Sequence, residues 1–192
     1  MLSREIASSL GGSYIQRNIY PFSFKEYLAY CNVELNRNWE FNPETRLMVV
    51  RRFAEYFRQG GFAESFDKTD KREWLTSLYQ KILMGDIVER NKIRNPRIFR
   101  LLARKLADSV MQPTTLKRLE HIIKSTGDTI SPTVLKDYLD YMEDAFLIFS
   151  IPNLASPLSE QQTIVKRYFA DNGILSLFLM DGETKLLENL VA

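Results

Sequence analysis

The chain has 192 residues, of which 45% are hydrophobic and 26% are charged, and its formal net charge is +2. This length and composition are those of a globular protein that buries a sizeable core in one large or two small domains. No apolar segment approaches the roughly 18 to 20 residues that a membrane span requires, and no signal-peptide pattern begins the chain. We therefore expect a cytoplasmic protein without a membrane partner.

The first thirty residues predict two helices with a strand between them. Residues 2–10 suit a short helix that ends at a Gly-Gly pair, and residues 14–20 alternate polar and apolar side chains as a strand does. Ser23 and Glu26 form a capping box, in which each side chain accepts a hydrogen bond from the other residue's backbone N–H. A helix over residues 23–30 follows from this start.

Three further helices are predicted by their first residues. Asn-Pro pairs at residues 42–43 and 95–96 start two of them, because Asn suits the N-cap and Pro lacks a donor that the first turn would leave unpaired. Asp70 with Glu73 starts the helix between them. Apolar residues at spacings of three and four then predict one buried stripe on each helix. The expected buried positions are Leu47, Val50, Phe53, Ala54 and Phe57 in the first helix, Trp74, Leu78 and Ile82 in the second, and Ile98, Leu101, Leu102 and Leu106 in the third.

Two more helices follow, separated by a short turn. The first ends at the turn around Gly127, where a positive φ is tolerated, and the second begins with Ser131 at the N-cap and Pro132 at the first helical position. Spacings of three and four again indicate one shared core for the two helices. Its expected members are Leu116, Leu119, Ile122 and Ile123 in the first helix and Leu135, Tyr138, Leu139 and Met142 in the second.

The second of these helices is followed by strand signals. An apolar run over residues 145–149 predicts a buried strand, and residues 163–170 resemble a second strand that pairs with residues 147–151. The polar residues 152–162 between the strands would form a wing. Two helices followed by such a hairpin indicate a winged helix, which is a module that binds nucleic acid or a partner surface.

Basic residues are concentrated before this helix pair. Residues 90–105 contain seven basic residues and no acidic one, and Arg97, Arg100 and Arg104 share one face of a helix. Such a stripe suits phosphate groups of nucleic acid or of a nucleotide, because Arg binds phosphate oxygens in a bidentate manner. The alternative is an ordinary solvated helix face. The candidate nucleic-acid contacts are Arg94, Arg97, Arg100, Arg104, Lys105, Thr133, Lys136, Lys166 and Arg167.

The helix over residues 131–144 has the opposite charge. It carries four acidic residues and only one basic residue, Lys136, so that most of its surface repels phosphates. We therefore expect only its first turns, with Thr133 and Lys136, to approach DNA. This helix is consequently a poor candidate for reading bases in the major groove.

The sequence contains no self-sufficient catalytic site. No GxxxxGK(S/T) motif is present, and the carboxylates are spread over helix faces without a companion base. Cys31 is the only cysteine, which excludes an internal disulfide or a thiolate zinc site and indicates a buried structural thiol. His121 is the only histidine and is expected at the surface or at its boundary. We expect no catalytic residue, no metal ligand and no resident cofactor in this chain.

Seven segments occur in a fixed order along the chain. They are LSREIASSL, YPFSFKEYL, QGGFAESF, GDIVERNKIRN, ISPTVLKDYLDYMEDAFLIFSIP, KRYFADNGIL and KLLENLV. Together they resemble the middle of a large prokaryotic family of AAA+ ATPases. That resemblance implies a mainly α (α+β) fold, with a helical lid bundle followed by a winged helix-turn-helix domain. It implies that the ATPase core, with its ATP and Mg²⁺ site, lies outside this chain.

The resemblance also implies a division of the chain and a function. Residues 1–21 would be a remnant of the ATPase core, residues 22–92 the lid, residues 93–175 the winged helix, and residues 176–192 the start of a truncated C-terminal domain. The chain would couple nucleotide state to binding of DNA or of a partner, without catalysis of its own. The alternative is a protein interaction module without nucleic-acid binding, in which exposed apolar faces contact another protein or a second copy.

The resemblance has one departure that concerns nucleotide binding. The family commonly has Gly-Arg after its first helix, whereas this chain has Gly12 and Ser13. Arg4 and Arg17 are the substitutes nearest in sequence for a nucleotide-facing arginine.

Overall fold

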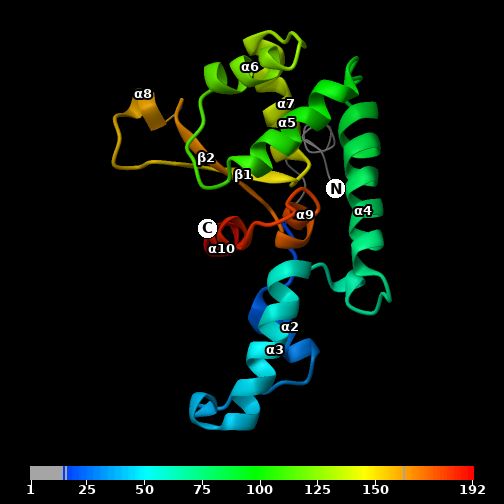
Figure 1. Cartoon of the computed structure of the whole chain (residues 1–192), viewed down its shortest axis with the longest axis vertical. Helices are drawn as coiled ribbons and strands as arrows, with labels where there is room; N and C mark the ends of the chain where they lie inside the picture. The colour runs from blue at the N-terminus through cyan, green and yellow to red at the C-terminus, as the bar shows by residue number, and fades with distance from the viewer. Residues whose placement is uncertain (1–14, 16, 162) are drawn as a thin grey trace. The chain divides into compact units, whose positions relative to one another are not determined.

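The computed structural model describes residue 15, residues 17–161 and residues 163–192, and most of these residues lie in helices. This part of the chain also contains a small antiparallel sheet of two strands (Figure 1). The structure divides into two units that do not follow chain order. Leu78–Ala170 form the main part of unit 1, whereas unit 2 contains Tyr20–Ser77 and Asp171–Ala192. A mainly helical fold is thus confirmed.

The N-terminal predictions have two outcomes. The helix expected over residues 2–10 lies outside the described residues. The strand expected over residues 14–20 is wrong where it can be assessed, since residues 15 and 17–20 are in no strand. Alternation alone does not make a strand, because a strand also needs a hydrogen-bonded neighbour. The described sheet is formed by β1 and β2 only.

Unit 1 contains the predicted helix pair and hairpin. Ser131 caps α7, its hydroxyl accepting a hydrogen bond from the N–H of Val134, and Pro132 is the first helical residue, as expected. Gly127 has a φ of +84° in the turn before this helix, also as expected. The elements of unit 1 are η3 (Ile82–Glu89, a π-helix), α5 (Pro96–Asp108), α6 (Leu116–Ser125), α7 (Pro132–Asp144), β1 (Ile148–Pro152), α8 (Leu158–Gln161) and β2 (Val165–Phe169).

The two strands of unit 1 pair with each other as predicted and form an antiparallel hairpin. The strand expected over residues 145–149 begins only at Ile148, and it is not fully buried, because Phe149 and Ile151 are exposed. Ile148 lies opposite Phe169, and Pro152 lies opposite Val165. The backbone N–H of Thr114, just before α6, donates to the carbonyl of Val165 at 2.9 Å. The hairpin is thereby joined to the helical part of the unit.

One apolar core holds unit 1 together. Helix α5 contacts α6 and β2, and α7 contacts α6 and β1. The predicted stripe of α7 is confirmed, since all four of its residues are buried. On α6 the stripe is confirmed at Leu119 and Ile123, while its other two members are only partly covered. Phe99 and Leu102 of α5 and Phe169 of β2 are fully buried in the same unit.

Unit 2 is built from the predicted N-terminal helices and the C-terminal segment. The capping box of Ser23 and Glu26 is present, with the Ser23 N–H 2.7 Å from Glu26 Oε2. The boundary between the units at residues 77–78 falls within α4 (Lys71–Lys81). The other elements of unit 2 are α2 (Phe24–Tyr30), η1 (Trp39–Phe41), α3 (Pro43–Gln59), η2 (Ala63–Ser65), α9 (Asn172–Ser176) and α10 (Glu183–Val191).

Helix α3 has the predicted ends but buries a different face. The side chain of Asn42 caps the helix by accepting hydrogen bonds from the backbone N–H groups of Glu44 and Thr45. Gly60 ends the helix. Its buried residues are Val49 and Tyr56, whereas Leu47 is 70% exposed and Val50 is 58% exposed. The predicted inward stripe is therefore wrong. The aromatic residues of α2 select the other side of α3, because Phe24 and Tyr27 each stack with Tyr56.

Helix α4 also buries a different face from the predicted one. Leu75 and Tyr79 are buried, whereas the predicted Trp74 and Leu78 are only partly covered. The chain continues directly from α4 into the π-helix η3, whose buried residues begin at Ile82. Leu75, Tyr79 and Ile82 are spaced by four and three residues, so the buried face of α4 continues into the first residue of η3 and lies next to the predicted one.

Asp171 joins the two segments of unit 2. Its Oδ2 accepts from the N–H of Gly61 and its Oδ1 from the N–H of Gly173, both at 2.7 Å. A Cβ at Gly60 would lie 1.8 Å from Asp171 Oδ1, so only glycine fits there. Burial raises the pKa of Asp171 to about 6, although the backbone N–H groups act in the opposite direction.

Asn172 makes a second polar link inside unit 2. Its Nδ2 donates to the carbonyls of Phe57 at 2.9 Å and of Leu186 at 3.0 Å. Its Oδ1 accepts from Nδ2 of Asn189, also at 3.0 Å. These bonds hold α9 to the end of α3 and to α10.

Candidate nucleic-acid interface

The basic stripe of α5 lies on the solvent side of this helix, as its spacing predicts. Arg97, Arg100 and Arg104 are exposed. Asn95 caps the helix and Pro96 is its first residue, so the start that orients the stripe is the predicted one. The opposite face is buried and contains Ile98, Phe99, Leu102, Ala103, Leu106 and Ala107. Burial of this apolar face fixes the direction in which the arginines point.

Helix α6 adds a second basic stripe that we did not predict. Lys117 and Lys124 are seven residues apart, which places them on one face of the helix, and both are exposed. Arg118 is also exposed, and its Nη2 donates to Oε1 of Gln112 at 3.0 Å. Because α6 contacts α5, the two stripes belong to one helix pair. The same spacing argument that identified the α5 stripe would have found this one.

Every carboxylate in residues 90–136 already has a basic partner from the same segment. The segment contains eleven basic and three acidic residues. Arg97 lies 3.4 Å from Asp128, and Lys105 lies 3.7 Å from Asp108. The third acid, Glu120, lies 2.7 Å from Lys124. No carboxylate of this segment is therefore left to neutralise the other basic residues.

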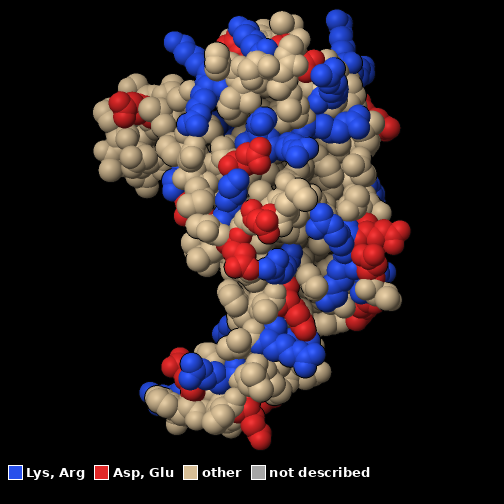
Figure 2. All heavy atoms as spheres, in the orientation of Figure 1, with Lys and Arg blue, Asp and Glu red and all other residues tan. Residues whose placement is uncertain are grey.

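Eight exposed basic residues of this segment form no ion pair with the part of the chain that the structure describes. Figure 2 shows Lys and Arg side chains gathered over the surface that contains α5 and α6. We call these eight residues the unpaired cations. They are Arg90, Lys92, Arg94, Arg100, Arg104, Lys117, Arg118 and Lys136.

The first turns of α7 differ in charge from the rest of the helix, as the sequence predicts. Thr133 and Lys136 are exposed near the N-terminal end of the helix. Asp140 is exposed on the following turns, and Glu143 accepts a hydrogen bond from the hydroxyl of Ser150. Only the N-terminal end of α7 therefore offers a surface that phosphates would not avoid.

The two predicted nucleic-acid contacts on β2, Lys166 and Arg167, are only partly exposed. Arg167 is partly buried and donates through Nη1 to Oγ1 of Thr114 at 2.9 Å. Burial lowers its pKa, although the carboxylates of Glu143 and Asp140 act in the opposite direction. Arg167 thus fastens β2 to the segment before α6, and Lys166 next to it is partly covered.

The remaining predictions concern Arg4, Arg17, Cys31, metal sites and membrane spans. Arg17 is exposed, whereas Arg4 lies outside the described residues. Cys31 is partly buried and packs against Leu28, Val33 and Val49 of unit 2. Over residues 15, 17–161 and 163–192, no group of His, Cys, Asp or Glu side chains is arranged to hold a metal ion. No helix among these residues has the length and apolarity needed to cross a membrane.

Comparison with known proteins identifies the family. Residues 50–185 match the model of a domain of unknown function, DUF8612. The chain belongs to this family. It is 30% identical to the uncharacterized protein MJ1544 of Methanocaldococcus jannaschii, over 100% of this chain and 44% of that protein. It is 29% identical to an uncharacterized protein of Haemophilus influenzae, over 91% of this chain and 42% of that protein. The chain thus spans less than half the length of these relatives, and no solved structure matches it significantly.

The comparison overturns the resemblance to AAA+ ATPases. The matching family model is that of DUF8612, and both relatives are uncharacterized proteins. The seven segments combine helix starts with apolar spacings of three and four, which many unrelated helical proteins share. The ATP and Mg²⁺ site, the nucleotide-facing Arg4 and Arg17, and the lid assignment have no other support and are withdrawn.

Proposed function

We propose that unit 1 binds nucleic acid through the phosphate backbone. The observation that supports this most is the set of eight unpaired cations around α5, α6 and the start of α7, which remain after every carboxylate of the segment is paired. Each cation that contacts a phosphate releases counterions from the nucleic acid, which gives affinity without requiring a particular base sequence.

The order of elements supports the same proposal. Helices α5, α6 and α7 followed by the β1–β2 hairpin have the order of a winged helix, and the turn between α6 and α7 is short. In that module the third helix commonly enters the major groove. Here the acidic residues of α7 oppose insertion beyond Lys136. We therefore propose contact with the backbone and little discrimination between base sequences.

Titration of a fluorescent 20-base-pair DNA duplex and of the corresponding RNA duplex tests this function. We expect binding whose logarithm falls linearly with the logarithm of salt concentration, with a slope of about −0.9 per phosphate contacted. The R97A/R100A/R104A variant should bind more weakly and with a shallower slope. Absence of binding at low salt, or binding that does not change with salt, would refute the proposal.

The exposed stripe of α3 supports a second candidate, which is self-association through unit 2. Leu47 and Val50 lie beside Phe41, which is 85% exposed, and these three residues line one groove. Glu40 and Arg46 line the same groove, so two copies in antiparallel orientation would bring unlike charges together. A second copy of the chain is therefore the proposed partner. A monomer in analytical ultracentrifugation at 100 μM, roughly the range of weak dimers, would count against it.

A further inference from the structure

The unpaired cations of unit 1 lie in a segment that offers almost no aromatic ring to a nucleic acid. Residues 90–136, all of which the structure describes, contain one phenylalanine and one histidine, but no tyrosine or tryptophan. Phe99 is fully buried in the core, so the imidazole of His121 is the only exposed ring of this segment. Bases that are unstacked from a single strand would therefore find at most one ring there.

The other exposed rings of unit 1 lie outside this segment. In the described part of residues 78–170 they are Phe146 and Phe149, each at 37% exposure. Phe146 follows Asp144 at the acidic end of α7, whereas Lys136 lies in the first turns of this helix. At a rise of about 1.5 Å per residue, Phe146 is about 15 Å from Lys136 along the helix axis. The ring of Phe149 stacks on Tyr168 of β2. Rings and unpaired cations are thus separated in unit 1.

This separation matters because single strands are bound by rings as well as by charge. Proteins that bind single strands combine a cationic surface with aromatic side chains on which the bases stack. Each stacked base raises the affinity roughly five- to 150-fold. The gain offsets the loss of freedom when a flexible strand is ordered. A surface of cations without rings lacks this compensation and suits a duplex, in which base pairing already holds the phosphates in place.

Counterion release favours a duplex as well. The slope of log affinity against log salt is about −0.9 per phosphate contact for B-DNA and about −0.7 for a single strand. If about six of the eight unpaired cations contact phosphates, the two slopes differ by about 1.2. Between about 1 M and about 0.15 M salt, this difference amounts to about tenfold in favour of the duplex.

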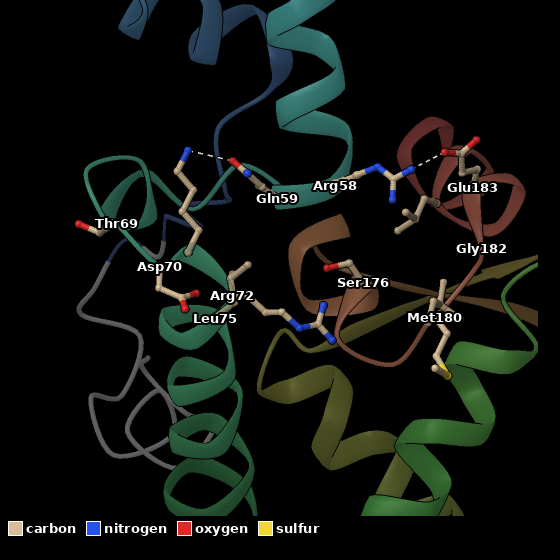
Figure 3. A pocket seen from close by; sticks show the side chains of 13 residues that line it. Arg58, Gln59, Thr69, Asp70, Arg72, Leu75, Ser176, Met180, Gly182 and Glu183 are labelled. Atoms are coloured by element: carbon tan, nitrogen blue, oxygen red, sulfur yellow. Dashed lines mark hydrogen bonds and ion pairs between the residues drawn. The ribbon is translucent and has the colours of Figure 1, made fainter.

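The basic side chains around a pocket of unit 2 do not form a second surface of this kind. The pocket has a volume of about 650 Å³ and lies between the end of α3, the first turns of α4, and the segment from α9 to α10. Figure 3 shows Arg58 extending to Glu183, with which it is paired. Lys71 donates to Oε1 of Gln59 at 2.8 Å, and Arg72 follows it on the helix, where consecutive side chains diverge. These cations do not converge on one phosphate.

We propose that unit 1 binds double-stranded nucleic acid and discriminates against single strands. This inference rests on the proposed function and specifies its substrate class. The discrimination has two physical sources, which are the scarcity of rings beside the unpaired cations and the larger counterion release from a duplex.

Fluorescence anisotropy of a labelled 20-base-pair DNA duplex and of a labelled single strand tests the inference. The single strand has about 40 nucleotides, which gives it about as many phosphates as the duplex, and a sequence that cannot pair with itself. We expect the full chain to bind the duplex about tenfold or more tightly at about 0.15 M salt, with a preference that shrinks as the salt concentration rises. Equal or tighter binding of the single strand would overturn the inference and leave nucleic-acid binding intact. Failure to bind either probe would refute the proposed function itself.

Substitutions at His121 test the role of stacking. His121 lies on α6 one turn from Lys117, which is one of the unpaired cations. His121→Trp places a large ring beside this cation, so it should raise the affinity for the single strand about fivefold or more and change the affinity for the duplex less than about twofold. His121→Ala should change both affinities less than about twofold. Leu154→Trp is the matched control, because Leu154 is 78% exposed in residues 152–163, which contain no basic residue.

The control separates a local effect of stacking from a general effect of an added ring. Equal gains for the single strand in His121→Trp and Leu154→Trp would show that the position of the ring is irrelevant and would overturn the inference. A large loss of single-strand affinity in His121→Ala would show that the wild type already stacks bases, with the same consequence. Circular dichroism of each variant establishes that it is folded, and the ratio of the two affinities in the wild type tests the inference without any substitution.

Discussion

Replacement of Arg100 and Arg104 by Gln should weaken nucleic-acid binding by an amount that can be calculated. Both residues are exposed on α5 and form no ion pair among the described residues. If each contacts one phosphate, the slope of log affinity against log salt becomes shallower by about 0.9 for each, or about 1.8 together. A slope difference of about 1.8 changes the ratio of the wild-type affinity to the variant affinity about 30-fold between about 1 M and about 0.15 M salt. This ratio corresponds to about 2 kcal/mol of binding free energy.

A variant that removes a negative charge from α5 should increase the affinity for nucleic acid. Asp108 lies 3.7 Å from Lys105, and its side chain is 47% exposed. Asp108→Asn leaves Lys105 available for a phosphate, so the affinity should increase by about fivefold, the square root of the loss expected for two arginines. The substitution also removes a carboxylate that is unfavourable at the C-terminal end of α5, so the free energy of unfolding should not decrease.

Fluorescence anisotropy at four salt concentrations measures both effects. The matched control is the K25Q/K68Q variant, which removes two exposed lysines from unit 2 and so changes the net charge by the same amount. Equal losses in R100Q/R104Q and K25Q/K68Q would show that only net charge matters. That result, or an unchanged affinity in Asp108→Asn, would refute the assignment of the interface to α5.

Three further predictions concern unit 2. Because burial raises the folded pKa of Asp171 from its usual value of 3.8 to about 6, the contribution of Asp171 to stability should be most favourable below pH 4 and should fall by about 3 kcal/mol as the pH rises through 6. Urea unfolding at pH 4 and pH 7 should show this fall in the wild type and not in Asp171→Asn; equal falls would contradict it. Gly60→Ala should lower the melting temperature much more than Gly127→Ala, because a Cβ at Gly60 collides with Asp171 whereas a Cβ at Gly127 meets open space. Leu47→Gln should leave stability within about 0.5 kcal/mol and reduce self-association, while Val49→Gln should cost several kcal/mol in urea unfolding. Comparable losses in the two variants would contradict the observed face of α3.

Local signals in the sequence predicted where elements begin and end. Ser23 with Glu26, Asn42 with Pro43, and Ser131 start helices in the structure because each cap needs only a few neighbouring residues. The stripe of α7 was also predictable, since one face of this helix is strongly apolar and the other is charged. The sequence likewise supplies the basic surface, because the surplus of cations in residues 90–136 is a property of composition.

Tertiary packing decided which face is buried where the sequence offers two. Helix α3 has apolar residues on two sides, and the aromatic rings of α2 select Val49 and Tyr56 over Leu47. Short apolar patterns also proved insufficient to identify the family, because many helical proteins share them.

The sequence by itself therefore determined helices α2 to α7, their first residues and the sign of the surface charge, since these depend on residues close together in the chain. Only the tertiary structure decided that residues 171–192 complete unit 2, because this depends on the contacts of Asp171 and Asn172 with residues more than one hundred positions earlier. It also decided which cations are paired with carboxylates, since Arg97 meets Asp128 only after α5 and α6 have packed together. The pocket of unit 2 arises in the same way, from three segments that the chain brings together only on folding.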